Sequence, residues 1–134
     1  MTTKNVLTVI GVLLGLQGIG IFFGAEAITR DAFAVWEPEG RAVDIGTMLH
    51  QAMGVTCLMV AVILLFARGL KPVDGAKVLM GASIGIALTT AHGFYNMFST
   101  DVQPPLPLLL LMSALAAVAF VTAMKAKATG TEGA

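Results

Sequence analysis

The polar residues that could do chemistry are few, and several of them lie in one apolar stretch, TTAHGFYNMF at residues 89–98. This stretch holds a histidine, a tyrosine and an asparagine within five residues. Imidazole and amide groups hydrogen-bond with many partners, and imidazole is also a common metal ligand. We therefore interpret these residues, with the polar residues of the other apolar stretches, as a candidate ligand-binding cluster. Its members are Gln17, Thr47, His50, Thr89, His92, Tyr95 and Asn96.

The elements that must position this cluster follow from composition. Hydrophobic residues make up 57% of the 134-residue chain and charged residues only 12%, whereas about 25% of a soluble domain is charged. Four stretches without charge are each long enough to cross about 30 Å of hydrocarbon as a helix. Lipid offers the backbone no partners, and barrel strands would be shorter and alternating, so that helices are expected. The sequence predicts an all-α integral membrane four-helix bundle running up-down-up-down as one domain, residues 1–134. The spans are residues 6–25, 45–67, 78–100 and 102–124, with an outer loop at residues 26–44.

The first span has features of a signal peptide, with Lys4 ahead of it and Ala25-Glu26-Ala27 behind it. Its apolar run at residues 6–23 is longer than the roughly 7 to 15 residues typical of such peptides. We therefore expect it to be a retained membrane span.

Basic residues set the expected orientation. Six of the eight lie on one side of the predicted spans, which is the cytoplasmic side by the positive-inside rule. The protein is then expected in the bacterial inner membrane with both termini in the cytoplasm. The loop at residues 26–44, which is net negative, is expected on the opposite side of the membrane. Trp36 in this loop is expected to be an anchor at the membrane interface, where tryptophan is enriched, or part of a lid or partner-docking segment. The six residues are Lys4, Arg68, Lys71, Lys77, Lys125 and Lys127.

Glycines indicate how the spans pack. GxxxG pairs let helix backbones approach closely. From the pair Gly81 and Gly85, steps of three and four residues along the same helix face reach Thr89, His92 and Asn96. These polar side chains therefore share a face with the glycines and are expected to point into the bundle. The packing glycines are Gly11, Gly15, Gly81 and Gly85.

Depth along alternating helices predicts that the cluster assembles in the outer half of the membrane. His92 lies about 12 Å below the outer end of its span at 1.5 Å per residue, and Gln17 and His50 lie at comparable depths. Four functions fit such a cluster. It can join helices by hydrogen bonds, form a pocket for a lipid, quinone or other small molecule, hold haem or a metal between two histidines, or conduct protons or ions. The histidines lack HxxxH or HxxE spacing, which disfavours a closed metal site.

The same spans disfavour several classes of protein. They contain no Asp, Glu, Lys or Arg, which weighs against a coupled transporter. It also weighs against an enzyme, because Ser83 and Ser113 have no evident carboxylate nearby. The single cysteine, Cys57, excludes an internal disulfide, and a net charge of zero provides no footprint for nucleic acid.

The layout of the chain resembles that of the DoxX-like group of small four-span bacterial membrane proteins. The resemblance lies in a glycine-rich first span, the segment GRAVDIGTMLHQAMGV, a second span ending in FARG, and the segment DVQPPLPLLL that leads into the last span. It covers nearly the whole chain. Members of that group with assigned roles are accessory subunits of redox or quinone-linked membrane enzymes, which the resemblance implies here. It assigns no functional residue.

The sequence thus favours a non-enzymatic membrane protein that acts as a homo-oligomer or as an accessory or assembly subunit of a membrane complex, in contact with membrane lipids. The alternatives are a protein that binds a lipid, a quinone or haem in its outer half, and a small oligomeric channel. A channel requires a continuous polar stripe through the membrane, whereas the polar residues gather in one half.

Overall fold

The computed structural model describes residues 2–101 and 104–131, with only the backbone for residues 129–131. These residues form five α-helices and one short 3-10 helix. By length and composition, every α-helix except α2 can cross a membrane, which indicates a multi-pass membrane protein. The prediction of an all-α fold with four long apolar helices is therefore confirmed. In chain order the elements are α1 (Thr3–Phe23), α2 (Ala25–Ala32), η1 (Ala34–Trp36), α3 (Arg41–Ala67), α4 (Pro72–Ser99) and α5 (Leu106–Thr131).

The helices differ from the predicted spans at several starts and at the end of α5, which continues to Thr131, beyond the predicted end at residue 124. α3 begins four residues before the apolar stretch, and α4 begins at Pro72, because charged residues and a first-turn proline continue a helix outside hydrocarbon. α5 begins at Leu106 because Pro104 and Pro105 precede it, and proline has no backbone N–H and restricts the residue before it. Residues 102–103, where the last span was predicted to start, lie outside the described residues.

The segment predicted as an outer loop contains α2 and η1. α2 follows α1 after Gly24, whose N–H donates to the Gly20 carbonyl and closes the last turn of α1. α2 rests on α3 and buries Ala25 and Thr29. Two residues with positive φ, Glu37 at 43° and Gly40 at 53°, then turn the chain into α3. The charge-free criterion missed α2 because Glu26, Arg30 and Asp31 interrupt its apolar residues.

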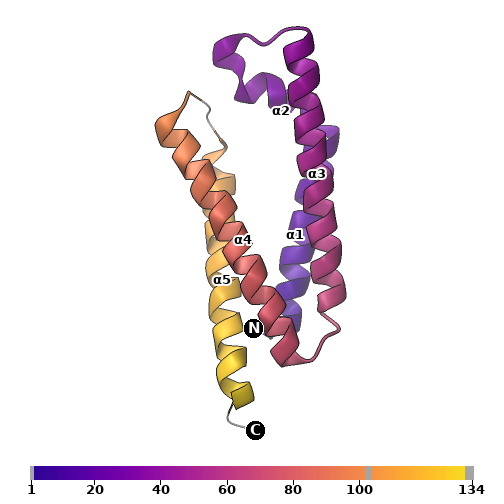
Figure 1. Cartoon of the computed structure of the whole chain (residues 1–134), viewed down its shortest axis with the longest axis vertical. Coiled ribbons are helices and arrows are strands. Elements are labelled where there is room, and N and C mark those ends of the chain that lie inside the picture. Colours follow the sequence, from indigo (N-terminus) through magenta and orange to yellow (C-terminus); the bar gives the residue numbers. More distant parts are fainter. Residues whose placement is uncertain (1, 102–103, 132–134) are drawn as a thin grey trace.

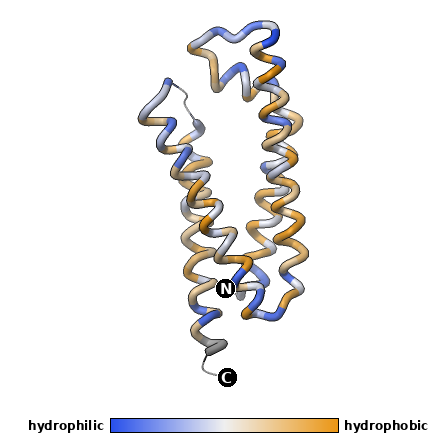
Figure 2. The backbone as a smooth tube through the Cα atoms, in the orientation of Figure 1, coloured by the Kyte–Doolittle hydropathy of each residue, from blue (hydrophilic) through white to orange (hydrophobic). Residues whose placement is uncertain are grey.

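The four long helices form two pairs, α1 with α3 and α4 with α5 (Figure 1). The pairs meet at the end of the molecule that holds the start of α1 and the α3–α4 connection, which we call the closed end. They diverge toward the end that holds α2, which we call the open end. On α1, α3 and α4 the buried core reaches no further from the closed end than Leu14, Ala61 and Leu79. Figure 2 shows hydrophobic residues along the middle of the long helices and hydrophilic ones concentrated toward the two ends.

The α1–α3 interface depends on glycine. A Cβ on Gly18 would lie 2.8 Å from the Gly54 carbonyl oxygen, and a Cβ on Gly54 would lie 2.8 Å from that of Gly18. A Cβ on Gly11 would lie 2.9 Å from Leu65 Cγ, so Gly11 also lies against α3. The predicted glycines are thus not equivalent. Gly15 leaves ordinary van der Waals space toward Ala61, while Gly81 and Gly85 on α4 have nothing within 4 Å of the position that a Cβ would take.

The contact between Gly18 and Gly54 predicts a large effect of one methyl group. Gly54→Ala should force α1 and α3 apart and lower the free energy of unfolding by about 1–3 kcal/mol, the usual range for overpacking. Gly20→Ala, at a helical glycine with open space, should be neutral or slightly stabilising, since alanine favours helix over glycine. Denaturation by increasing SDS in mild detergent, followed by circular dichroism, measures both. Equal stability of the two variants would show that the close approach does not hold the pair together.

Candidate functional site

The first group of predicted polar residues lies where α2 rests on α3. Thr29 of α2 is 1% exposed, and its hydroxyl donates to the Ala25 carbonyl at 2.8 Å. The same oxygen lies 2.9 Å from His50 Nδ1 of α3, which also lies 2.9 Å from the Gly46 carbonyl oxygen. Gly46 makes this possible because any Cβ there would overlap the Thr29 side chain. A half-buried hydrogen bond therefore fixes α2 on the open half of α3.

These contacts determine the tautomer of His50. The only proton of the Thr29 hydroxyl goes to Ala25, so the hydroxyl oxygen can only accept from the imidazole, and the Gly46 carbonyl can only accept as well. Nδ1 must then carry a proton that it shares between the two oxygens. In the neutral ring Nε2 holds the lone pair, and no described residue hydrogen-bonds to it. An imidazole whose Nδ1–H is held by a backbone carbonyl is oriented as metal-binding histidines usually are.

The second group lies on α4 alone. Asn96 Nδ2 donates to His92 Nε2 at 3.3 Å, so the lone pair of this imidazole is engaged, unlike that of His50. Tyr95 stacks against His92 with ring centroids 6.5 Å apart and an interplanar angle of 19°. The Thr89 hydroxyl donates to the Gly85 carbonyl one turn earlier. His92, Tyr95 and Thr89 are exposed, and Asn96 is half-buried.

The remaining predicted residues lie apart from these groups. Gln17 is half-buried in α1, and its Oε1 is fully buried without a hydrogen-bond partner among the described residues. Thr47 lines a pocket of about 340 Å³ with charged residues of α2 and α3 at the open end. Trp36 is 55% exposed and stacks on Phe33 with ring centroids 5.5 Å apart; Phe33 in turn meets the His50 ring edge-on at 6.4 Å.

The structure therefore divides the polar residues between the two helix pairs. His50 belongs to the α1–α3 pair and His92 to the α4–α5 pair, and within the described residues no hydrogen bond or ring contact joins them. No three His, Cys, Asp or Glu side chains of residues 2–101 and 104–131 come together as metal ligands. The two groups are therefore separate candidate sites. In the first, Nε2 of His50 is available to a ligand, and in the second, Nε2 of His92 already accepts a hydrogen bond from Asn96.

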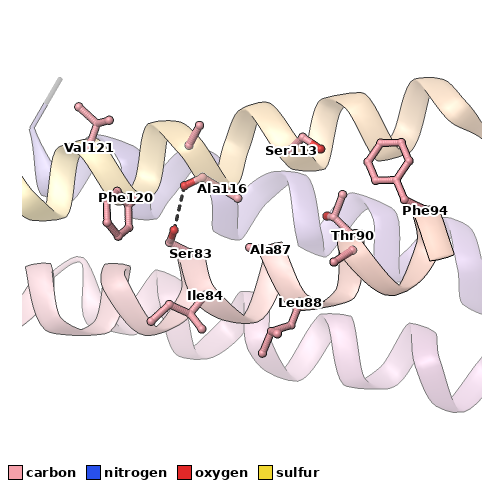
Figure 3. A pocket seen from close by; sticks show the side chains of 12 residues that line it. Ser83, Ile84, Ala87, Leu88, Thr90, Phe94, Ser113, Ala116, Phe120 and Val121 are labelled. Atoms are coloured by element: carbon pink, nitrogen blue, oxygen red, sulfur yellow. Dashed lines mark hydrogen bonds between the residues drawn. The ribbon is translucent and has the colours of Figure 1, made fainter.

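Sequence reasoning missed an apolar groove of about 770 Å³ between α4 and α5 (Figure 3). Its three hydroxyls are all satisfied by backbone carbonyls: Ser83 donates to Ala116 across the pair at 2.9 Å, while Thr90 and Ser113 donate within their own helices. Such a wall offers hydrocarbon contact and no hydrogen bond. The hydroxyls also lack the adjacent base that activates a nucleophile. In the sequence, the groove is indicated only by small residues, alanine and serine, that recur along α4 and α5. Its lining is Ser83, Ile84, Ala87, Leu88, Thr90, Ala91, Phe94, Ser113, Ala116, Ala117, Phe120 and Val121.

The Thr29–His50 contact can be tested with a side chain of nearly the same shape. Thr29→Val removes the acceptor for the His50 N–H, and should lower stability by about 0.5–1.5 kcal/mol, the typical net value of one hydrogen bond. Because this bond fixes α2, hydrogen–deuterium exchange should accelerate in α2 and not in α4. Thr56→Val is the matched control, since the exposed Thr56 hydroxyl donates only to Ala52 of its own helix. Unchanged exchange in α2 would contradict the docking role.

The fold and this geometry were compared with known proteins. No family model matches the chain, and neither the curated proteins nor the solved structures include a match. The function must therefore be inferred from the residues and their arrangement.

Proposed function

We propose that the chain is a non-enzymatic protein of the bacterial inner membrane that acts by lateral association with other membrane helices. It works as a homo-oligomer or as an accessory or assembly subunit of a larger membrane complex. Its four long helices run up-down-up-down with both termini in the cytoplasm.

Charge supports this orientation. The closed end carries six basic residues. Asp74, an acidic residue in the first turn of α4, is paired with one of them, Lys77, at 3.0 Å. The open end carries acidic residues in excess around α2 and the start of α3, where Arg30 is paired with Glu26 at 2.9 Å. Under the positive-inside rule the closed end is cytoplasmic.

The observation that carries the proposal is a row of small and polar residues on α4, against which no other helix of the described residues packs at the glycines. The row consists of Gly81, Gly85, Thr89, His92 and Asn96, and it follows one helix face in steps of three and four residues. All are exposed except Asn96, and the two glycines have open space above them. We call this the α4 row.

The chemistry of the α4 row fits a helix as its partner. Glycines allow the backbone of a second helix to approach closely, and the imidazole and amide above them have donor and acceptor capacity beyond the single bond between them. Lipid tails cannot satisfy that capacity, whereas polar side chains of another helix can. The proposal omits catalysis because the hydroxyls of Ser83, Thr90 and Ser113 donate to backbone carbonyls, and no base lines the groove beside them.

Two glycine variants test the association. Gly85→Ile adds bulk to the α4 row and should abolish the assembly, while Gly20→Ile adds the same bulk at an open position on α1 and should preserve it. Native mass spectrometry in mild detergent gives the readout. The unaltered protein should appear as a multiple of 13.9 kDa or with tens of kilodaltons of partner protein. A bare 13.9 kDa monomer, or equal behaviour of both variants, would contradict the proposal.

A second candidate function is binding of a lipid, a quinone or haem between the two helix pairs at the open end. Two observations favour it: the unpartnered Nε2 lone pair of His50 and the buried, unpartnered Oε1 of Gln17. Both atoms can accept a hydrogen bond from a ligand, and Nε2 of His50 can also bind a metal.

Ligand co-purification tests this second function. A bound molecule should add several hundred daltons to the native mass, and His50→Ala should remove it by deleting the available nitrogen. His92→Ala should weaken binding less, because its Nε2 already accepts from Asn96. Retention of the added mass in both variants would eliminate the pocket as its site.

A further inference from the structure

A second pocket lies at the closed end, where elements of both helix pairs meet. Its volume is about 440 Å³, and it is bounded by the start of α1, the end of α3, the start of α4 and the last part of α5. Three basic residues line it: Lys4 of α1, Arg68 directly after α3, and Lys125 of α5. Thr2 and Thr3 contribute to the same wall.

The lining is one-sided in charge. None of the described residues that line this pocket is acidic. Asp74 in the first turn of α4 is outside the lining and is paired with Lys77. Three basic side chains, Lys4, Arg68 and Lys125, therefore line one concave surface. Such a surface attracts anions.

Two helix starts add to this field. α1 begins at Thr3 and α4 at Pro72, and both residues line the pocket. The N-terminus of a helix carries a partial positive charge, and its first N–H groups have no partner within the helix. Thr2 uses its hydroxyl for one of them, the N–H of Asn5, and the first turn of α1 contains no acidic residue. The backbone thus favours the same sign of ligand as the side chains.

The position of the pocket indicates the source of the anion. Arg68 directly follows the second apolar stretch, Lys125 directly follows the fourth, and Lys4 lies just before the first. The pocket is therefore at the level where hydrocarbon gives way to lipid head groups. Leu7 and Leu70 line it beside the charges, which suits a molecule with an anionic group next to an alkyl chain.

We propose that this pocket binds the phosphate group of an anionic phospholipid, with Lys4, Arg68 and Lys125 as its cationic contacts. Basic pockets between membrane helices on the cytoplasmic side are suited to such head groups. The site is separate from the α4 row and does not require the association proposed above.

The test compares two neighbouring charges of the full-length protein. Native mass spectrometry or a lipid titration in mild detergent measures binding of phosphatidylglycerol and of phosphatidylcholine with identical acyl chains. The protein should prefer phosphatidylglycerol, and Arg68→Gln should weaken that binding about fivefold, as expected for one basic residue near the membrane surface. Lys4→Gln should act in the same way. Lys71→Gln removes the same charge three residues from Arg68, outside the lining, and should leave the affinity unchanged.

Three outcomes would overturn the proposal. Equal binding of the two lipids would remove the role of the anion, and equal losses in Arg68→Gln and Lys71→Gln would reveal diffuse attraction by surface charge. Complete displacement of phosphatidylglycerol by excess inorganic phosphate would assign the pocket to a free anion instead of a lipid. Circular dichroism of each variant confirms that the exposed substitutions leave the helices intact.

Discussion

The close approach of α1 and α3 at Gly18 and Gly54 is the contact on which the other features depend. Hydrocarbon forces each span to satisfy its own backbone as a helix, but it does not choose which helices touch. Here the choice is made where two backbones meet without a Cβ between them. Once α1 lies on α3, the turn at Gly24 returns the chain over the same helix, and Thr29 reaches His50.

The open end follows from where the polar groups find partners. In a membrane, hydrogen bonds between helices compete with bonds inside one helix or one pair. His50 bonds to Thr29 and Gly46 within its own pair, and His92 bonds to Asn96 on its own helix. Among residues 2–101 and 104–131, therefore, no side-chain hydrogen bond joins the two pairs between the closed end and the open end. Their contact is left to aliphatic side chains near the start of α1 and the end of α3.

The helices were predictable from the sequence because the absence of charge is a local property. α2 was not, since an eight-residue amphipathic helix is stabilised by the surface on which it rests. The depth of His50 and His92 along their helices was also predictable, but their lateral separation depends on how two pairs of helices pack. Likewise, a GxxxG pattern indicates small residues on one helix face but does not indicate which helix packs against them. Gly18 and Gly54, on different helices, form the closest approach, while the pair Gly81 and Gly85 meets nothing.

The charge of the closed end acts on the same contact that holds the helix pairs together. Lys4 and Arg68 belong to the first pair and Lys125 to the second, so the pocket is lined by basic side chains of both pairs. Attraction between opposite charges is stronger beside hydrocarbon than in water, because the surrounding dielectric constant is lower. An anion in the pocket would therefore be attracted to both pairs. A lipid phosphate there would therefore stabilise the region where α1 and α3 contact α4 and α5, while the α4 row, which does not line the pocket, stays accessible.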